Sequence, residues 1–488
     1  MVSPIILVAL PLAAAFLITL AGNREVARIV ALLTALGTVW VAATWLLPSL
    51  AGSTVIVVGG IAAPFGIGLA IDALSAGFAL LVAVSLTLVV LYSFSYIGGE
   101  HGRGNEARYY AVLLLLGAAS FGLLLTRDLF NLFVFYEILC IASYILVAYG
   151  QDQRALEASF KYMILGSLGS LLMLVSIGLA YRAAGSLAMT DIAAALAAAE
   201  PGYALLTALL FFFGMAVEAA VFPVNTWLPD AHSSAPSSIS AVLSGFVIEL
   251  ALVVLVRLVG TVFAPAGIGA VLPVLALVGV LVGEIAAFSQ TELKRMLAYS
   301  SMGQVGLILF ALALGTEAGT QAGLTHLLMH TGAKSALFLI AGYFIVRTDR
   351  RDIESYRGLA ARMPVSSVLF ALAALSLVGV PPFFGFFSKF RVLAAASAVG
   401  GGLAWGGIAV ILAATVLEGF YLFRVVRVLF ERDEAAERAG GTPAARMELA
   451  APALVATALF VLLVILGGAV LPQFDTILAP AASALAVL

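Results

Sequence analysis

Apolar runs of about 20 residues recur from one end of this chain to the other, and each is long enough to cross a bilayer as a helix. The 488 residues are 63% hydrophobic and only 10% charged, whereas an ordinary soluble domain carries roughly 25% charged residues. No linker divides the runs into soluble domains, and we expect residues 1–22 to form the first of many spans rather than a cleaved signal. The sequence therefore predicts one transmembrane domain over residues 1–488, with an all-α polytopic fold.

The runs correspond to about fourteen predicted spans, and prolines interrupt two of them. The spans lie at residues 3–21, 27–48, 71–96, 109–126, 129–149, 158–181, 202–222, 238–259, 268–288, 295–315, 322–346, 363–387, 403–430 and 450–471. The seventh span runs into Pro223 and Pro229, and the twelfth contains VPPFFG at 380–385. Proline lacks a backbone donor and blocks the carbonyl four residues before it. A break inside a bilayer therefore needs protein or water around it.

Broken spans in corresponding positions of two halves indicate inverted repeats around a transport site. The two breaks are five spans apart, so we predict that spans four to eight and spans nine to thirteen form two inverted repeats. The predicted parts of the chain are residues 1–107 with three spans, 108–262 with the first repeat, 263–431 with the second repeat, and 432–488 with a loop and the last span.

Lysine and arginine are distributed unevenly over the connecting loops, and this asymmetry predicts orientation. With the N-terminus outside, the inside loops contain Arg24, Arg28, Arg103, Arg108, Arg154, Lys161, Lys294, Arg295 and the clusters at 347–362 and 424–446. The outside loops contain only Arg127, Arg182 and Arg257, with Lys389 and Arg391 at the end of the twelfth span. We therefore expect a multi-pass protein of the cell (inner) membrane with both termini on the outer side.

Ionisable residues occur within the predicted spans, where each charge costs roughly a few kcal/mol or more. They are Glu137, Glu218, Glu249, Glu284, Lys334, Lys389 and Glu418, with His326 and His330. Any one of them could belong to a buried pair that holds helices together, or could reach the interface. The whole set indicates a water-filled or ion-conducting path. Glu284 and Glu418 stand alone in the sequence and are the weaker candidates.

His326, His330 and Lys334 follow each other at intervals of four residues, which places them on one face of a helix. Histidine exchanges protons readily near neutral pH. Two histidines at this spacing could also bind zinc, but the HExxH pattern is absent and the lysine would repel a cation. The spacing therefore favours proton transfer over a metal site.

Two short polar stretches lie between spans. DAH at 230–232 is predicted to be a loop, in which Asp230 has a structural role and His232 either caps a helix or lies at the mouth of a path. QTELKR at 290–295 is predicted to be an inside loop and the start of a helix, with mostly solvated charges and with Lys294 as a candidate for the inner end of a path.

Five ordered motifs resemble the antiporter-like membrane subunits of respiratory complex I, membrane-bound hydrogenases and Mrp-type sodium/proton antiporters. They are DLFNLFVFYEI at 128–138, EASFKY at 157–162, NTWLPDAH at 225–232, LKRMLAYSSMGQVG at 293–306 and PPFFGFFSK at 381–389. The stretch around Glu137 looks most like the D-type Mrp subunit. The resemblance covers nearly the whole chain and implies fourteen helices, inverted repeats and proton translocation along a central hydrophilic axis.

The resemblance also implies roles for individual residues. Glu137 matches the family's glutamate in the fifth span, Lys334 its lysine in the eleventh, and Lys389 its charged residue at the broken twelfth span. His330 falls on a histidine position just before that lysine. The family usually has lysine at the positions of Glu218 and Glu249, so the charge is reversed at both.

The two substituted glutamates suggest a different ion chemistry in the first half. We expect Glu218 to lie near Glu137 between the fifth, seventh and eighth spans, with one proton shared by the two carboxylates. Such a pair could also hold a sodium ion in transit through its oxygen atoms. The sequence therefore predicts that these carboxylates bind a cation in transit, next to the break of the seventh span.

The leading interpretation is a proton-translocating, antiporter-like subunit of a larger membrane complex, with sodium/proton exchange as an open possibility. The alternatives are a proton-pumping subunit of a redox machine like complex I or a hydrogenase, and a structural subunit that does not conduct. One cysteine, Cys140, argues against thiolate metal sites, and no nucleotide loop or haem pair is present. We expect no cofactor, no resident metal and no nucleic acid. The expected partners are other membrane subunits, lipid and protons, with sodium as a further candidate ion.

Overall fold

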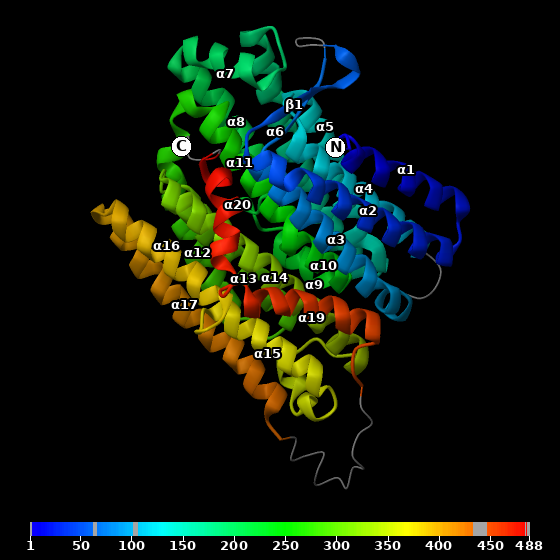
Figure 1. Cartoon of the computed structure of the whole chain (residues 1–488). Coiled ribbons are helices and arrows are strands. Elements are labelled where there is room, and N and C mark those ends of the chain that lie inside the picture. Colours follow the sequence, from blue (N-terminus) through cyan, green and yellow to red (C-terminus); the bar gives the residue numbers. More distant parts are fainter. Residues whose placement is uncertain (1, 62–65, 101–105, 433–446, 484, 486–488) are drawn as a thin grey trace.

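The fold is a bundle of long helices in a computed structural model that describes residues 2–61, 66–100, 106–432, 447–483 and 485 (Figure 1). The longer helices are α1 (Ile6–Ala21), α2 (Arg24–Leu50), α3 (Ala73–Glu100), α4 (Glu106–Leu125), α5 (Leu129–Val147), α6 (Gln153–Ala184), α8 (Pro201–Glu218), α11 (Ile248–Thr261), α12 (Leu272–Phe288), α13 (Leu293–Leu312), α14 (Glu317–Thr348), α15 (Pro364–Val378), α16 (Phe384–Val399), α17 (Gly401–Phe430), α19 (Ala451–Leu466) and α20 (Leu471–Ser483). The shorter helices are α7 (Met189–Ala198), α9 (Leu228–Ser234) and α10 (Ser237–Val242).

The predicted spans all fall on helices. In the described part of the chain, 11 helices are long and apolar enough to cross a membrane, or up to 13 if each of two bent helix pairs counts as one span. Helix α1 has only 16 residues. The all-α polytopic fold is confirmed, while the number fourteen and the inverted relation of the repeats stay predictions.

Both predicted helix breaks are present. Helix α8 ends at Glu218 and α9 begins at Leu228, with a cis peptide bond before Pro223 in between. Helix α15 ends at Val378 and α16 begins at Phe384, again with a cis X-Pro bond in the gap. Proline therefore interrupts the helices where the sequence predicts, and each break leaves polar backbone groups inside the bundle.

One end of the bundle carries a β-hairpin, and we call this end the hairpin side. Strands β1 (Thr54–Val57) and β2 (Gly68–Ile71) pair antiparallel, and β2 also touches Thr126 at the end of α4. Helix α7 lies at the same end, at the top of Figure 1, whereas the short turns at Ile353–Ala361 lie at the opposite end. These elements therefore mark the two sides of the bundle.

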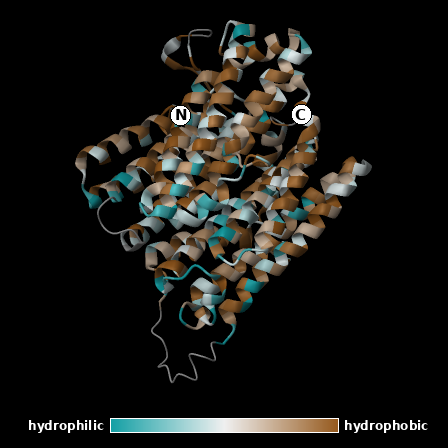
Figure 2. Ribbon diagram, turned by 180° about the vertical axis from the view of Figure 1, so that it is seen from behind, coloured by the Kyte–Doolittle hydropathy of each residue, from teal (hydrophilic) through white to brown (hydrophobic). Residues whose placement is uncertain are grey.

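Helix α14 runs through the interior of the bundle. It packs against α10, α13, α15, α16 and α19. In its most apolar stretch of 18 residues, 89% of the residues are buried. Peripheral helices instead expose large apolar side chains such as Trp40 and Phe160, as expected for a surface against lipid. Figure 2 shows hydrophilic segments within the bundle between mostly hydrophobic helices. Polar residues on α14 are therefore enclosed by protein.

Candidate functional site

The three predicted residues of α14 are fully buried, and each has a different partner. His326 contacts α13 and α16, His330 contacts α11, and Lys334 donates to the Leu297 carbonyl over 3.0 Å. One helical face therefore touches three neighbouring helices at successive turns. The predicted common face is confirmed in geometry, and no direct bond joins the three side chains in the described residues.

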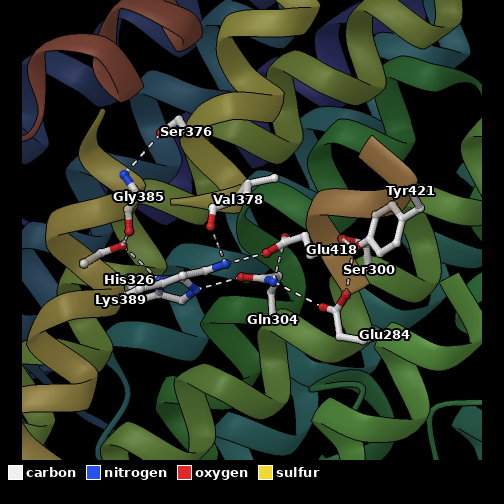
Figure 3. A network of polar contacts seen from close by, with 11 residues as sticks. Glu284, Ser300, Gln304, His326, Ser376, Val378, Gly385, Lys389, Glu418 and Tyr421 are labelled. Atoms are coloured by element: carbon white, nitrogen blue, oxygen red, sulfur yellow. Dashed lines mark hydrogen bonds and ion pairs between the residues drawn. The ribbon is translucent and has the colours of Figure 1, made fainter. Parts of the chain in front are cut away.

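His326 connects α14 to a wider polar network (Figure 3). Its Nε2 lies 2.8 Å from the Gln304 side-chain oxygen, and its Nδ1 lies 3.0 Å from the Ser388 hydroxyl. Gln304 in turn donates to Glu418 over 3.0 Å and to Glu284 over 3.3 Å. A single glutamine thus joins an imidazole to two carboxylates.

Lys389 forms a buried ion pair with Glu418, and it also donates to the Val378 carbonyl over 3.2 Å. Val378 ends α15, so its carbonyl is one of the groups that a helix terminus leaves without an intrahelical partner. The C-terminus of a helix also favours a positive charge. The helix break therefore supplies part of the lysine's binding site, together with Glu418 from α17.

Glu284 and Glu418 do not stand alone, which corrects the sequence-based expectation. Glu284 accepts from the Tyr421 hydroxyl over 2.8 Å, and Tyr421 also lies 2.8 Å from the Ser300 hydroxyl. Glu418 pairs with Lys389. Both carboxylates are fully or almost fully buried, and their partners come from other helices. The sequence hides these contacts because the partners are distant along the chain.

Glu249 binds the second histidine of α14. Its Oε1 lies 2.5 Å from His330 Nδ1, and its Oε2 accepts from the Thr331 hydroxyl over 2.5 Å. All three side chains are buried. His330 Nε2 has no hydrogen-bond partner within the described residues. The reversed charge at this position is therefore matched by a neighbouring imidazole, which carries a positive charge when protonated.

The polar stretches beside the break differ from the predictions. DAH at 230–232 lies in helix α9 rather than in a loop. His232 is buried against the Phe338 ring, and neither of its ring nitrogens has a hydrogen-bond partner within the described residues. Lys294 is not solvated: it is 1% exposed and donates to the Ala235 carbonyl over 2.5 Å. The helix packing encloses residues that look like loop residues in the sequence.

Asp230 has a structural role, as the sequence predicts, but it acts through ion pairs. Its carboxylate pairs with Lys161 of α6 over 3.1 Å and with Arg295 of α13 over 2.7 Å. These cations belong to the two predicted repeats. Asp230 therefore ties the two halves together at the end of the bundle opposite the hairpin side.

Glu218 and Glu137 have separate partners in the first half. Glu218 accepts from the Tyr162 hydroxyl over 2.6 Å and from the Cys140 thiol over 3.5 Å. Glu137 is only partly buried and accepts from Ser170. No hydrogen bond joins the two carboxylates among the described residues. The shared proton therefore stays a prediction, while the bonds of Glu218 in this structure go to Tyr162 and Cys140.

Sequence reasoning missed the neutral members of the network, namely Gln304, Ser388, Tyr421 and Thr331. A glutamine or serine in a span costs far less than a charge and gives no signal by itself. Gln304 and Ser388 do lie inside two of the quoted motifs, at 293–306 and 381–389. Their position inside those motifs was the only feature of the sequence that could have indicated a functional role.

Comparisons with known proteins identify the family of this chain. The sequence model of the family described as "NADH:quinone oxidoreductase/Mrp antiporter, TM" matches residues 126–417. This chain belongs to that family. The matched region contains α5 to α16 and most of α17, and thus every residue of the polar network except Glu418 and Tyr421. The protein is a multi-pass, antiporter-like membrane subunit.

Individual relatives cover most of the chain. NADH-quinone oxidoreductase subunit N of Desulforudis audaxviator is 37% identical over 74% of this chain and 72% of its own length. The D-type subunit of the Na(+)/H(+) antiporter of Bacillus subtilis is 30% identical over 84% of this chain and 82% of its own. A chain from the structure of the membrane-bound sulfane sulfur reductase, an archaeal respiratory membrane complex, has a TM-score of 0.90 and 34% identity, with 99% and 98% of the two chains covered.

Proposed function

We propose that this chain translocates protons across the cell membrane as the antiporter-like subunit of a heteromeric complex. The buried polar row along α14 carries this proposal. It runs from Glu249 through His330 and His326 to Gln304, and from there to the ion pair of Glu418 and Lys389. Charges this deep in an apolar bundle usually line an ion pathway.

The row has one step that protein atoms do not bridge. His326 and His330 are four residues apart, which is about 6 Å along a helix. His330 Nε2 is buried without a protein partner in the described part of the chain. Buried polar atoms normally bond to protein or to ordered water. We therefore expect a water molecule to bond His330 Nε2 and to lead toward the partners of His326, because both ring nitrogens of His326 are already bonded to Gln304 and Ser388.

The test is proton transport by the purified complex in proteoliposomes. Lys334→Ala removes the lysine of the α14 face, and transport should fall to background while the subunits still co-purify. Glu317→Gln is the matched control on the same helix, because Glu317 is exposed in the first turn. Normal transport by assembled Lys334→Ala and Lys389→Ala complexes would favour the structural, non-conducting subunit.

We also propose a redox complex as the assembly to which this chain belongs, because sequence identity supports it. The subunit N and sulfane sulfur reductase matches are 37% and 34% identical, against 30% for the Bacillus antiporter chain. Identification of the subunits that co-purify from native membranes tests this candidate. Redox subunits would support it, and a set of antiporter subunits with sodium-dependent transport would support the Mrp type.

The predicted orientation is part of the proposal. It places the hairpin side outside and the side of Asp230 inside, according to the distribution of lysine and arginine. Of the cations counted inside, Arg103 and those at 433–446 lie outside the described residues. A tag inserted at 433–446 should react with antibody only from the cytoplasmic side of the membrane. Reaction from the other side would reverse the orientation.

A further inference from the structure

A cavity on the hairpin side brings together two of the three arginines that the sequence places outside. The cavity has a volume of about 130 Å³, which is room for roughly four water molecules at about 30 Å³ each. Arg127, between α4 and α5, and Arg257, in the last turns of α11, both line it. Thr190 and Thr261 are exposed and form its rim. The remaining wall is mostly apolar.

The charges in this cavity do not balance. Arg257 forms an ion pair with Asp72, and Asp72 is further held by hydrogen bonds with Ser75. The side chain of Arg127 has no ion pair or hydrogen bond within the described residues, so two guanidinium groups share one carboxylate. Burial and the nearby charge of Arg257 lower the pKa of Arg127, and Asp72 opposes this only in part. A second anion would compensate the excess charge.

A second, purely apolar groove adjoins this cavity. It has a volume of about 250 Å³ and is lined by residues of α2, α3, α14, α19 and α20. Leu74, in the first turn of α3, lines both the cavity and the groove. The charged cavity and the apolar groove therefore meet at one side chain.

The length of the groove matches half of a bilayer. Along α3 its wall extends from Ala73 to Val84, which is about 16 Å at a rise of 1.5 Å per residue. The hydrocarbon core of a bilayer is about 30 Å thick. Val84 is 39% exposed at the far end, so the groove is open to lipid there. One acyl chain of a single leaflet has the polarity and the reach to fill it.

We infer that an anionic phospholipid of the leaflet on the hairpin side binds here, with its phosphate at Arg127 and Arg257 and one acyl chain in the groove of α3, α14 and α20. Arginine binds phosphate oxygens with planar, paired donors. The apolar groove distinguishes this ligand from a free anion, which would leave about 250 Å³ of apolar space unfilled. The site lies apart from the polar row, on the other side of α14.

The sequence offers variants for each half of the site. Arg127→Gln removes the unpaired charge and leaves the Asp72 pair intact, and exposed Arg182→Gln is its control. Gly77→Leu fills the groove, and it fits because a Cβ there would only touch Ile477 at 3.6 Å. Gly178→Leu is the matched control, because a Cβ at Gly178 meets nothing within 4 Å.

The experiment measures lipid binding and melting temperature of the purified, delipidated complex, and needs no transport assay. Phosphatidylglycerol should bind and raise the melting temperature by several degrees, whereas phosphatidylcholine with the same chains and inorganic phosphate should have less than half this effect. Arg127→Gln and Gly77→Leu should each weaken phosphatidylglycerol binding about tenfold, and the two controls should not change it. Equal effects of the two lipids, an equal effect of phosphate alone, or unchanged binding in both variants would overturn the inference.

Discussion

The two halves of this subunit stabilise their buried carboxylates in different ways. In the first half, Glu218 accepts from two neutral groups, Tyr162 and Cys140, and forms no ion pair among the described residues. In the second half, Glu418 pairs with Lys389 and is joined through Gln304 to His326. The first arrangement is a local cluster around one carboxylate, and the second is a chain of linked groups. Glu249 connects the two halves, because it belongs to α11 of the first half and binds His330 on α14 of the second.

Removal of Lys389 should have the largest effect on the second half. Lys389→Ala leaves Glu418 buried without its cation, and breaking a buried ion pair in this way typically costs about 3–5 kcal/mol. We expect transport at background level and a lower melting temperature of the complex. The double variant Lys389→Met with Glu418→Met should recover most of the stability and none of the transport. Transport by Lys389→Ala at more than half of the wild-type rate would contradict a role of the linked chain in proton transport.

Gln304→Met cuts the linked chain without changing a charge. Methionine has nearly the same length but cannot bond His326 or the two carboxylates, so we expect assembly to persist and transport to fall about tenfold, equivalent to about 1.4 kcal/mol in the barrier. Gln321→Met is the control, because Gln321 lies near the surface end of α14 and outside the network. Wild-type transport by Gln304→Met would mean that protons bypass the glutamine.

Glu249→Gln tests the junction between the halves. The variant keeps a hydrogen-bond acceptor for Thr331 but removes the charge beside His330. Transport should fall about fivefold, equivalent to about 1 kcal/mol, as measured by the initial rate of acidification. Thr331→Val removes only the hydroxyl and should have a smaller effect. If Thr331→Val slows transport more than Glu249→Gln does, the Thr331 hydroxyl matters more for transport than the charge of Glu249.

Glu218→Gln should have the smallest effect on proton transport. Its partners are neutral, so the amide can replace the carboxylate at little cost, and we expect a change of less than about twofold at a fixed pH. If the site holds sodium, the variant should instead lose the sodium dependence of transport. Rates with and without sodium across a pH series separate the two outcomes. A loss as large as that of Lys389→Ala would show that the first half also conducts by a linked chain.

Asp230→Asn probes the contact between the halves and should change stability by only about 1 kcal/mol, because ion pairs near the surface are weak. Burial alone would raise the pKa of Asp230, but Lys161 and Arg295 outweigh it and lower the pKa. The folded-state pKa is thus below the unfolded one, so this stabilisation is present at neutral pH and is lost as pH falls through the folded-state pKa. The melting temperatures of wild type and variant should therefore converge in acid. A constant difference would exclude Asp230 as the titrating group.

Much of the architecture could be predicted from local features of the sequence. The spans fall on helices, and the breaks occur beside Pro223 and Pro381, because both follow from residues adjacent in the chain. The common face of His326, His330 and Lys334 follows from the helical period alone. The five motifs also led to the correct family, which the match over residues 126–417 shows.

The partners of these residues could not be predicted. Glu284 and Glu418 look isolated in the sequence, and the DAH stretch looks like a loop, yet packing places the first two in a network and the third in helix α9. Lys294 belongs to a stretch whose charges look mostly solvated, and it is buried and donates to the Ala235 carbonyl. In each case, helices that are remote in the chain enclose the residue.

The sequence by itself determined that the chain lies in a membrane as interrupted helices, because run length, proline and helical period act over a few turns. Only the tertiary structure decided which charges meet. Glu249 and His330 are 81 residues apart, and Gln304 and Glu418 are 114 apart. A buried charge requires a partner or a proton, but its own sequence neighbours do not specify which helix supplies it. That choice depends on how the helices pack, and the packing gave Glu218 neutral local partners but placed Glu418 in a chain of linked groups.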